Sequence, residues 1–267
     1  MTQPAPLLAL LTDFGRVDPY VAQVHAVLMT AAPGVPILDI SHDVAPGNLW
    51  QAGFFLTATL PWLPPGSVVC AVVDPGVGTD RRVLVVQAGP HWIVAPDNGL
   101  LTPVFSRPDG CRYFDATPRV LPASATFHGR DVFAPLAARL AMGETATDLA
   151  GVWTGPDPVR LPGLVPHRDG ETLAGRVLSV DRFGNVILSL AIAACGPLPP
   201  AAALLAPVAC PLSPATTYGT IPEGQVGLLA GSQGYYELAV AGASAATRLG
   251  LAGGDAVTLF WPPGVPT

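Results

Sequence analysis

The stretch VVDPGVGTDRRVLVV (residues 72–86) contains two β-branched apolar runs, separated by a break rich in Gly and Pro. Such a pattern predicts a strand, a turn and a second strand. Asp74 ends the first run and Arg81 begins the second. A turn needs Gly and Pro for their backbone conformations, but it does not need an acid and a base together. We expect a hairpin that brings Asp74 and Arg81 side by side as part of a site.

Strand and helix signals alternate around this stretch in the first half of the chain. Strands are predicted within residues 7–12, 36–41, 67–74, 81–89 and 91–99, and helices within residues 18–34, 48–64 and 128–143. Asp18 and Pro19 have the residue types of an N-cap and a first helical position. Strands that alternate with helices are typical of an α/β layered domain, here with a central, mainly parallel sheet.

The composition changes in residues 155–170, which contain four Pro and three Gly and which we interpret as a linker. Short strand signals follow in residues 172–181, 185–190, 225–231, 235–241 and 255–261, with one short helix in residues 244–251. The sequence therefore predicts an N-terminal α/β domain (residues 1–160) and a C-terminal β-rich, barrel-like domain (residues 161–267).

The overall composition excludes several classes of protein. The net charge is −6, Lys is absent and no basic run occurs, which argues against a nucleic-acid surface. No uncharged apolar run reaches the ~18 residues that a membrane span needs, and the N-terminus is typical of a first strand and not of a signal peptide. Four scattered cysteines without a CxxC pair indicate free thiols and a cytoplasmic location.

Several polar residues follow predicted strands or begin a helix: Asp13, Asp74, Asp97, Asn98, Asp181 and His128. Ligands bind at the carboxyl ends of strands in open α/β sheets. Each residue alone also fits a turn or a cap, because Asp favours both. So many of them together in such an apolar chain favour a functional site.

Two kinds of chemistry fit these residues. A metal-dependent hydrolase would bind its ion through oxygen and nitrogen ligands, although the sequence contains no HxH or HExxH pattern. The candidate metal ligands are Asp13, His42, Asp43, Asp74, Asn98 and His128. The other is metal-free positioning of a nucleophile by an Asp, an Arg and a His. The segment DRFGN (residues 181–185) supplies an aromatic ring and an amide, which suit a flat heterocycle such as the base of a nucleoside.

Five motifs occur in an order that resembles the S-adenosyl-L-methionine (SAM) hydroxide adenosyltransferases, also called the DUF62 family and related to the SAM-dependent fluorinase and chlorinase. They are TDFGRVDPYV (12–21), VDPGVGTDRR (73–82), APDNG (95–99), TFHGRD (126–131) and DRFGNV (181–186). The resemblance implies an α/β domain and a β-barrel-like domain in a homotrimer with active sites between subunits. It also implies hydrolysis of SAM at C5′ of the ribose to adenosine and L-methionine, without metal or cofactor.

The resemblance also implies roles for individual residues. The catalytic set corresponds to Asp74, Arg81 and His128. The residues that correspond to substrate-binding positions are Asp13 for the ribose hydroxyls, Asp18 and Asp181 for the methionine ammonium, Asn185, Phe127 and Phe183 for adenine, and Ser232 for the methionine carboxylate. Gln233 follows Ser232 where the halogenases have an Arg, so a direct ion pair is not expected there.

The site residues favour water over halide as the nucleophile. The halogenases have an aromatic residue at the position of Asp74 and lack the His at position 128, and a carboxylate there would repel a halide. Two other classes stay open: a metal-dependent hydrolase, which would lose activity with chelator, and a nucleoside-binding module, which would bind without turnover. The set of Asp74, Arg81 and His128 argues against the binding module, because binding alone does not need it.

Overall fold

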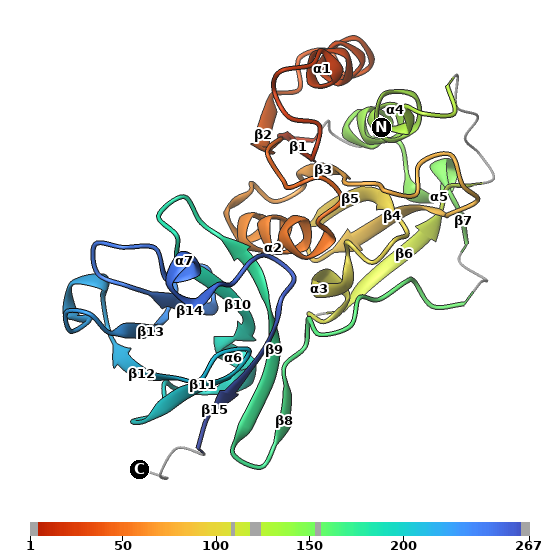
Figure 1. The fold of residues 1–267 in the computed structure, drawn as a ribbon. Coiled ribbons are helices and arrows are strands. Elements are labelled where there is room, and N and C mark those ends of the chain that lie inside the picture. The colour runs from red at the N-terminus through yellow and green to blue at the C-terminus, as the bar shows by residue number, and fades with distance from the viewer. Residues whose placement is uncertain (1–4, 108–109, 118–123, 153–155, 263–267) are drawn as a thin grey trace. The chain divides into compact units, whose positions relative to one another are not determined.

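The computed structural model describes residues 5–107, 110–117, 124–152 and 156–262 (Figure 1). The chain divides into two compact units, Met1–Leu161 and Pro162–Thr267. The division falls within the segment that the sequence predicts as a linker, whose first residue, 155, lies outside the described residues. Each unit has its own hydrophobic core, so each is described by itself.

The first unit is built on a mixed sheet with the strand order β2-β1-β3-β5-β4-β6-β7 in the described residues. Strands β2 (Ile37–Ser41), β1 (Leu8–Thr12), β3 (Val68–Val72) and β5 (His91–Pro96) are parallel. The other strands, β4 (Val83–Ala88), β6 (Cys111–Asp115) and β7 (Gly151–Val152), pair antiparallel. This sheet confirms the predicted α/β class.

Helices cover both faces of this sheet, because alternate strand residues point to opposite sides. In β1, Leu8 and Leu10 pack with α1 (Tyr20–Ala31) and α4 (Ala134–Ala141). Ala9 and Leu11 pack instead with α2 (Leu49–Thr59), the 3₁₀ turn η1 (Leu60–Trp62) and α3 (Thr102–Phe105). A single π-helical turn, η3 (Gly129–Phe133), precedes α4, and α5 (Ala146–Leu149) follows it.

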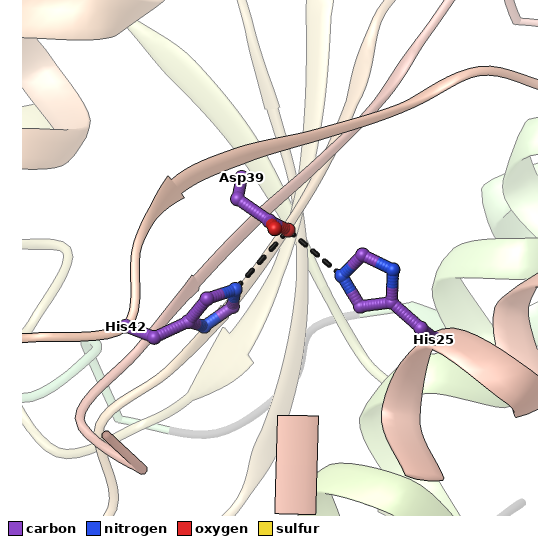
Figure 2. A group of neighbouring side chains, drawn as sticks. All are labelled: His25, Asp39 and His42. Carbon is purple, nitrogen blue, oxygen red and sulfur yellow. Dashed lines mark hydrogen bonds and ion pairs between the residues drawn. The ribbon is translucent and has the colours of Figure 1, made fainter. Parts of the chain in front are cut away.

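The start of α1 differs from the sequence prediction. The helix begins at Tyr20, and Pro19 occupies the cap position without a side-chain hydrogen bond, so the predicted N-cap role of Asp18 is wrong. Asp18 is left exposed. One turn further along α1, His25 reaches Asp39 of the edge strand β2, which also faces His42 (Figure 2).

The predicted hairpin between the two strands of residues 72–86 is also wrong. Strand β5 lies between β3 and β4, parallel to β3 and antiparallel to β4, with Val94 opposite Cys70 and Val85. Residues 73–82 are therefore a loop past the carboxyl end of β5. The apolar runs identified the two strands correctly, but a run of residues does not specify which strand will be its neighbour.

The second unit contains a closed seven-stranded β-barrel in the described residues, which confirms the predicted barrel-like fold. Its order is β10 (Val186–Ala191), β14 (Tyr235–Ala239), β13 (Val226–Ala230), β12 (Cys210–Ala215), β11 (Ala202–Ala206), β15 (Ala256–Phe260) and β9 (Thr172–Val180). Pairing of β9 with β10 closes the barrel, and β8 (His167–Asp169) pairs with β9 outside it. Short helical segments are α6 (Ile192–Cys195), η4 (Tyr218–Thr220) and α7 (Ala245–Leu249).

The cysteines and the helices can be compared with what the composition predicts. All four cysteines are free thiols, with Cys70 and Cys195 buried and Cys111 and Cys210 half-buried. Burial raises the pKa of the Cys70 thiol to about 12, which makes it unreactive. Among the described residues, every helix is too short or too polar to cross a membrane.

Candidate active site

The loop of residues 73–82 is shaped by tight turns that only glycine can complete. The backbone N–H of Val77 donates to the carbonyl of Asp74 (3.2 Å), and the Thr79 hydroxyl donates to the carbonyl of Gly76 (2.7 Å). Gly78 has a φ of +81°, and a Cβ there would lie 2.8 Å from the carbonyl oxygen of Ala125. Both facts require glycine at this position. The loop so folded turns Arg81 back toward Asp74.

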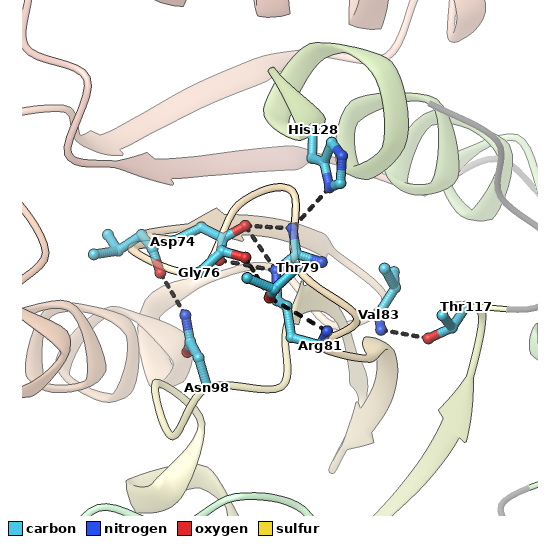
Figure 3. Close-up of polar contacts among 9 residues, drawn as sticks. Asp74, Gly76, Thr79, Arg81, Val83, Asn98, Thr117 and His128 are labelled. Carbon is cyan, nitrogen blue, oxygen red and sulfur yellow. Dashed lines mark hydrogen bonds and ion pairs between the residues drawn. The ribbon is translucent and has the colours of Figure 1, made fainter. Parts of the chain in front are cut away.

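Asp74, Arg81 and His128 form one connected cluster (Figure 3). The Nε of Arg81 donates to both carboxylate oxygens of Asp74 at 2.9 Å, and Nη2 donates to Oδ2. Nη2 also lies 2.9 Å from Nδ1 of His128. The Asp74 and Arg81 side chains are 4% and 8% exposed, and the guanidinium lies over the Phe133 ring. The structure thus brings together the three residues that the resemblance implies as catalytic.

The contact with Arg81 fixes the protonation of His128. A guanidinium has no acceptor, so Nδ1 of His128 must accept the hydrogen bond, and the neutral ring carries its proton on Nε2. Burial lowers the pKa of His128, the charge of Arg81 lowers it further, and Asp74 and Asp131 oppose this only partly. His128 is therefore a neutral side chain with an Nε2–H donor at neutral pH.

Asp13 and Asp74 follow β1 and β3, the two neighbouring strands between which the order of strands in the sheet reverses. The chain leaves β1 through α1 to β2, and returns through α2 to β3 on the other side of β1. Ligands bind at such a topological switch point in doubly wound sheets. Oδ2 of Asp13 accepts a hydrogen bond from Gly47 N (2.8 Å). Burial raises the pKa of Asp13, opposed by backbone hydrogen bonds, and the charge of Asp74 raises it further.

Asn98 and Asp97 have supporting contacts at the end of β5. The Asn98 amide donates to the carbonyl of Val73 (2.8 Å), which ties the end of β5 to the residue before Asp74. Asp97 pairs instead with Arg82, whose Nε donates to Oδ2 at 2.8 Å. We interpret both residues as structural supports of the loop.

Phe127 belongs to an aromatic group beside the cluster. Its ring makes edge contacts with Phe14 and Tyr20, at centroid distances of 5.6 and 5.2 Å, and the guanidinium of Arg130 lies 5.0 Å from its centroid. A Cβ at Gly129 would lie 2.8 Å from the Phe14 ring, so glycine permits this packing. The π-helical turn begins here, directly after His128, and such turns occur frequently at functional sites.

The second unit has a pocket of about 860 Å³ beside the turn between β9 and β10. Asp181, Phe183 and Asn185 line it, together with Tyr218 and Ser244. Oδ1 of Asp181 accepts hydrogen bonds from the backbone N–H groups of Phe183 (2.8 Å) and Asn185 (2.9 Å), and Oδ2 accepts one from the Asn185 amide (2.8 Å). Asp181 thus organises the turn that presents Phe183, which is 80% exposed.

Ser232 does not line this pocket. It lies with Gln233 in the exposed turn between β13 and β14. The sequence reasoning missed another pair at the pocket, in which the Tyr218 hydroxyl donates to the buried Glu237 at 2.6 Å. Burial raises the pKa of Glu237, while that hydrogen bond raises the pKa of Tyr218 to about 12. The sequence did contain a signal for this pair, because Glu237 is an acid within the otherwise apolar stretch YYELAVA (residues 235–241).

The metal-ligand set that the sequence offered as an alternative is not assembled. Asp74 and His128 are both held by Arg81, and Asp43 faces Arg16 at 3.3 Å. Among the described residues, the one group of at least three His, Cys, Asp or Glu side chains close enough to share an ion is His25, Asp39 and His42. Only His42 of that group was among the predicted ligands.

These observations define a protein with a doubly wound α/β unit, which carries a buried Asp–Arg–His cluster at its switch point, and a β-barrel unit with an aromatic pocket. Residues 8–150 match the model of the SAM hydroxide adenosyltransferase N-terminal domain, and residues 175–258 match that of the C-terminal domain. The chain therefore belongs to the SAM hydroxide adenosyltransferase family.

Known proteins agree with this assignment. The chain is 42% identical over 261 residues to the (R)-S-adenosyl-L-methionine hydrolase of Thermus thermophilus, covering 94% of this chain and 98% of the relative. A fluorinase from Actinoplanes sp. is 26% identical over 209 residues, covering 68% and 70%. The crystal structure of an uncharacterized conserved protein from Thermotoga maritima superimposes with a TM-score of 0.81 at 30% identity, covering 94% and 99%.

Proposed function

We propose that this protein hydrolyses SAM to adenosine and L-methionine, and that its substrates include the (R)-sulfonium form named for its relative. The observation that carries the proposal is the single guanidinium of Arg81, which holds both Asp74 and His128. The identity of 42% to a hydrolase, against 26% to a fluorinase, supports water and not halide as the nucleophile.

In the proposed reaction, a water oxygen attacks C5′ as the C5′–S bond breaks. The sulfur keeps the bonding electron pair and leaves as the neutral thioether of methionine, so no general acid is needed. The barrier lies with the water, which must be desolvated and aligned behind C5′. Asp74 accepts a hydrogen bond from this water, Arg81 and the Nε2–H of His128 stabilise the developing hydroxide, and the proton leaves to solvent.

We propose roles for the remaining residues as the family resemblance implies them. Asp13, at the switch point, binds the ribose hydroxyls. Its hydrogen bond from Gly47 supports this role, because it holds the carboxylate in one orientation. The other proposed contacts are Asp18 and Asp181 with the methionine ammonium, Phe127, Phe183 and Asn185 with adenine, and Ser232 with the methionine carboxylate. The proposed reaction has SAM as its substrate and includes no cofactor.

We also propose that the protein is a homotrimer with active sites at the subunit interfaces. The division of the proposed residues supports this arrangement. Asp13, Asp74, Arg81 and His128 belong to the first unit, whereas Asp181, Phe183 and Asn185 belong to the second. Light scattering coupled to size-exclusion chromatography measures the number of subunits, and a monomeric mass would contradict it.

The test of the function is incubation of the purified protein with each sulfonium epimer of SAM, in chelator and without added metal. Liquid chromatography follows adenosine and methionine. Equal amounts of both products in chelator are the expected result. Activity that appears only when metal is restored would instead favour a metal-dependent hydrolase. Tight nucleoside binding without products would favour a binding module.

A further inference from the structure

Three side chains of the first unit converge on one point away from the Asp74–Arg81–His128 cluster (Figure 2). Nε2 of His25, on α1, lies 2.8 Å from Oδ1 of Asp39, on β2. Nε2 of His42, which follows β2, lies 3.1 Å from the same oxygen. The three ligand atoms all lie within 4.8 Å of one another. Two imidazole nitrogens and a carboxylate oxygen form a donor set that suits zinc and related transition metals.

His42 is the most informative member of this group because it is buried. Its side chain is 1% exposed, and its Nδ1 lies 2.8 Å from the hydroxyl oxygen of Thr12. Its Nε2 has no partner of acceptable hydrogen-bond geometry, although Asp39 is near. When Nδ1–H donates to Thr12, the lone pair of Nε2 faces a carboxylate oxygen. A cation between the two atoms would relieve that repulsion.

The contact with Thr12 also has the form expected behind a metal ligand. Histidine ligands almost always donate their other ring N–H to an oxygen, which fixes the tautomer and the direction of the ligating nitrogen. Thr12 is itself fixed by its place at the end of β1, where its side chain is fully buried. His42 is therefore oriented before any ion arrives, as a metal ligand would be.

The spacing and the surroundings leave room for an ion. Ligand atoms in a tetrahedral zinc site lie ~3.4 Å apart for bonds of about 2.0–2.2 Å. The two separations that involve Asp39 are 2.8 and 3.1 Å, so each needs to open by roughly 0.3–0.6 Å to reach this spacing. The two imidazole nitrogens lie at most 4.8 Å apart. The side chains of His25 and Asp39 are 27% and 36% exposed, and they line a hollow of about 500 Å³ with Asp18. Water from this hollow can complete the coordination.

We propose that His25, Asp39 and His42 form a binding site for one divalent transition-metal ion of the zinc type. The ion would join α1 to the edge strand β2. It would also fix the end of β1 through Thr12, next to Asp13. The site shares no residue with the Asp74–Arg81–His128 cluster, so it does not depend on the proposed function.

Isothermal titration calorimetry with Zn²⁺ tests the proposal on the metal-stripped full chain. We expect one ion per chain, and a loss of affinity of at least about tenfold in His25→Ala and in Asp39→Asn. Both side chains are partly exposed, so the variants should fold, and circular dichroism checks this. His167→Ala, at an exposed histidine of the second unit, is the matched control and should bind Zn²⁺ as the wild type does.

Cobalt provides a second readout that reports geometry. Co²⁺ bound by the three side chains should give the visible absorption of a four- or five-coordinate ion, and Zn²⁺ should abolish it. The proposal is overturned if the wild type binds no Zn²⁺. It is equally overturned if folded His25→Ala and Asp39→Asn bind Zn²⁺ as tightly as the wild type.

Discussion

The pair of Asp74 and Arg81 is almost shielded from solvent, so a substitution there can change both catalysis and stability, and each must be measured. Asp74→Asn keeps the shape of the side chain but removes the charge that would polarise the attacking water. We expect kcat to fall by about 10²–10⁴-fold, as for loss of a proton acceptor, while SAM affinity changes little. Steady-state kinetics and calorimetric binding of SAM measure the two effects.

The neighbouring pair of Arg82 and Asp97 is the matched control for Asp74→Asn. It is also largely buried, with Asp97 only 2% exposed, and it lies at the other side of the same loop. Asp97→Asn removes the carboxylate partner of Arg82 and should therefore lose stability but retain most of kcat. If Asp97→Asn lost as much kcat as Asp74→Asn, the catalytic role of Asp74 would be contradicted.

His128 should make stability depend on pH in a defined direction. Its pKa in the folded chain lies below the ordinary value of 6.5, first through burial and then through Arg81. As the pH falls below 6.5, the ordinary pKa that His128 has in the unfolded chain, the unfolded chain takes up a proton before the folded chain does. The free energy of unfolding therefore decreases. Above that pH, the ring is neutral in both states and the contribution is constant.

The prediction from this titration is a smaller loss of stability at acid pH in His128→Gln than in the wild type. Urea unfolding between about pH 5 and pH 7.5 measures the difference between the two slopes. His91 also has a pKa lowered by burial, but it is present in both proteins and cancels. Identical slopes in the two proteins would show that His128 titrates normally.

At the scale of elements, the loop of residues 73–82 determines where Arg81 lies, and Gly78 determines the shape of the loop. Gly78→Ala places a side chain at a φ of +81° and 2.8 Å from the Ala125 carbonyl. We expect a strain of about 1–2 kcal/mol from the backbone and about 1–3 kcal/mol more from the clash. Because the loop must shift to relieve the clash, kcat should fall as well.

Gly34→Ala separates the two effects. Gly34 has nearly the same φ, +82°, but no atom lies within 4 Å of the position of its Cβ. This variant should lose only the backbone contribution of about 1–2 kcal/mol and keep its activity. Chemical unfolding and kinetics of both variants check the prediction, which fails if Gly78→Ala is no more harmful than Gly34→Ala.

The strands show which parts of the fold can be predicted from the sequence and which cannot. Apolar runs located β1 to β5, since most of these strands are buried on both faces, but they could not show that β5 separates β3 from β4. Strands β11 and β12 were not predicted, because residues 201–215 are rich in Ala and Pro and lack the usual β-branched pattern.

For the proposed site, the order of the motifs pointed to Asp74, Arg81 and His128, which the structure places in one cluster. The sequence could not show that Arg81 holds Nδ1 of His128, because the tautomer depends on a contact between residues 47 positions apart. It also missed His25 and Asp39, which belong to no motif and meet only because α1 lies beside the edge strand β2.

For the whole molecule, the proposed trimer explains why the residues proposed to be catalytic and those proposed to bind adenine can belong to different units. If each active site takes its Asp–Arg–His cluster from one subunit and its aromatic pocket from a neighbour, two inactive variants should complement each other. Asp74→Asn damages only the first half of a site, and Asn185→Ala damages only the second half. Neither variant alone should show substantial turnover at low SAM concentration.

Co-expression of these two variants then predicts a specific recovery. With random assembly, each interface receives an intact cluster in half of the cases and an intact pocket in half, so about a quarter of the sites are complete. The mixture should therefore regain about a quarter of the wild-type activity. A mixture of separately purified proteins, without subunit exchange, is the control and should stay inactive. If co-expression restores nothing although mixed oligomers form, each site is made within one chain, because complementation is possible only across an interface.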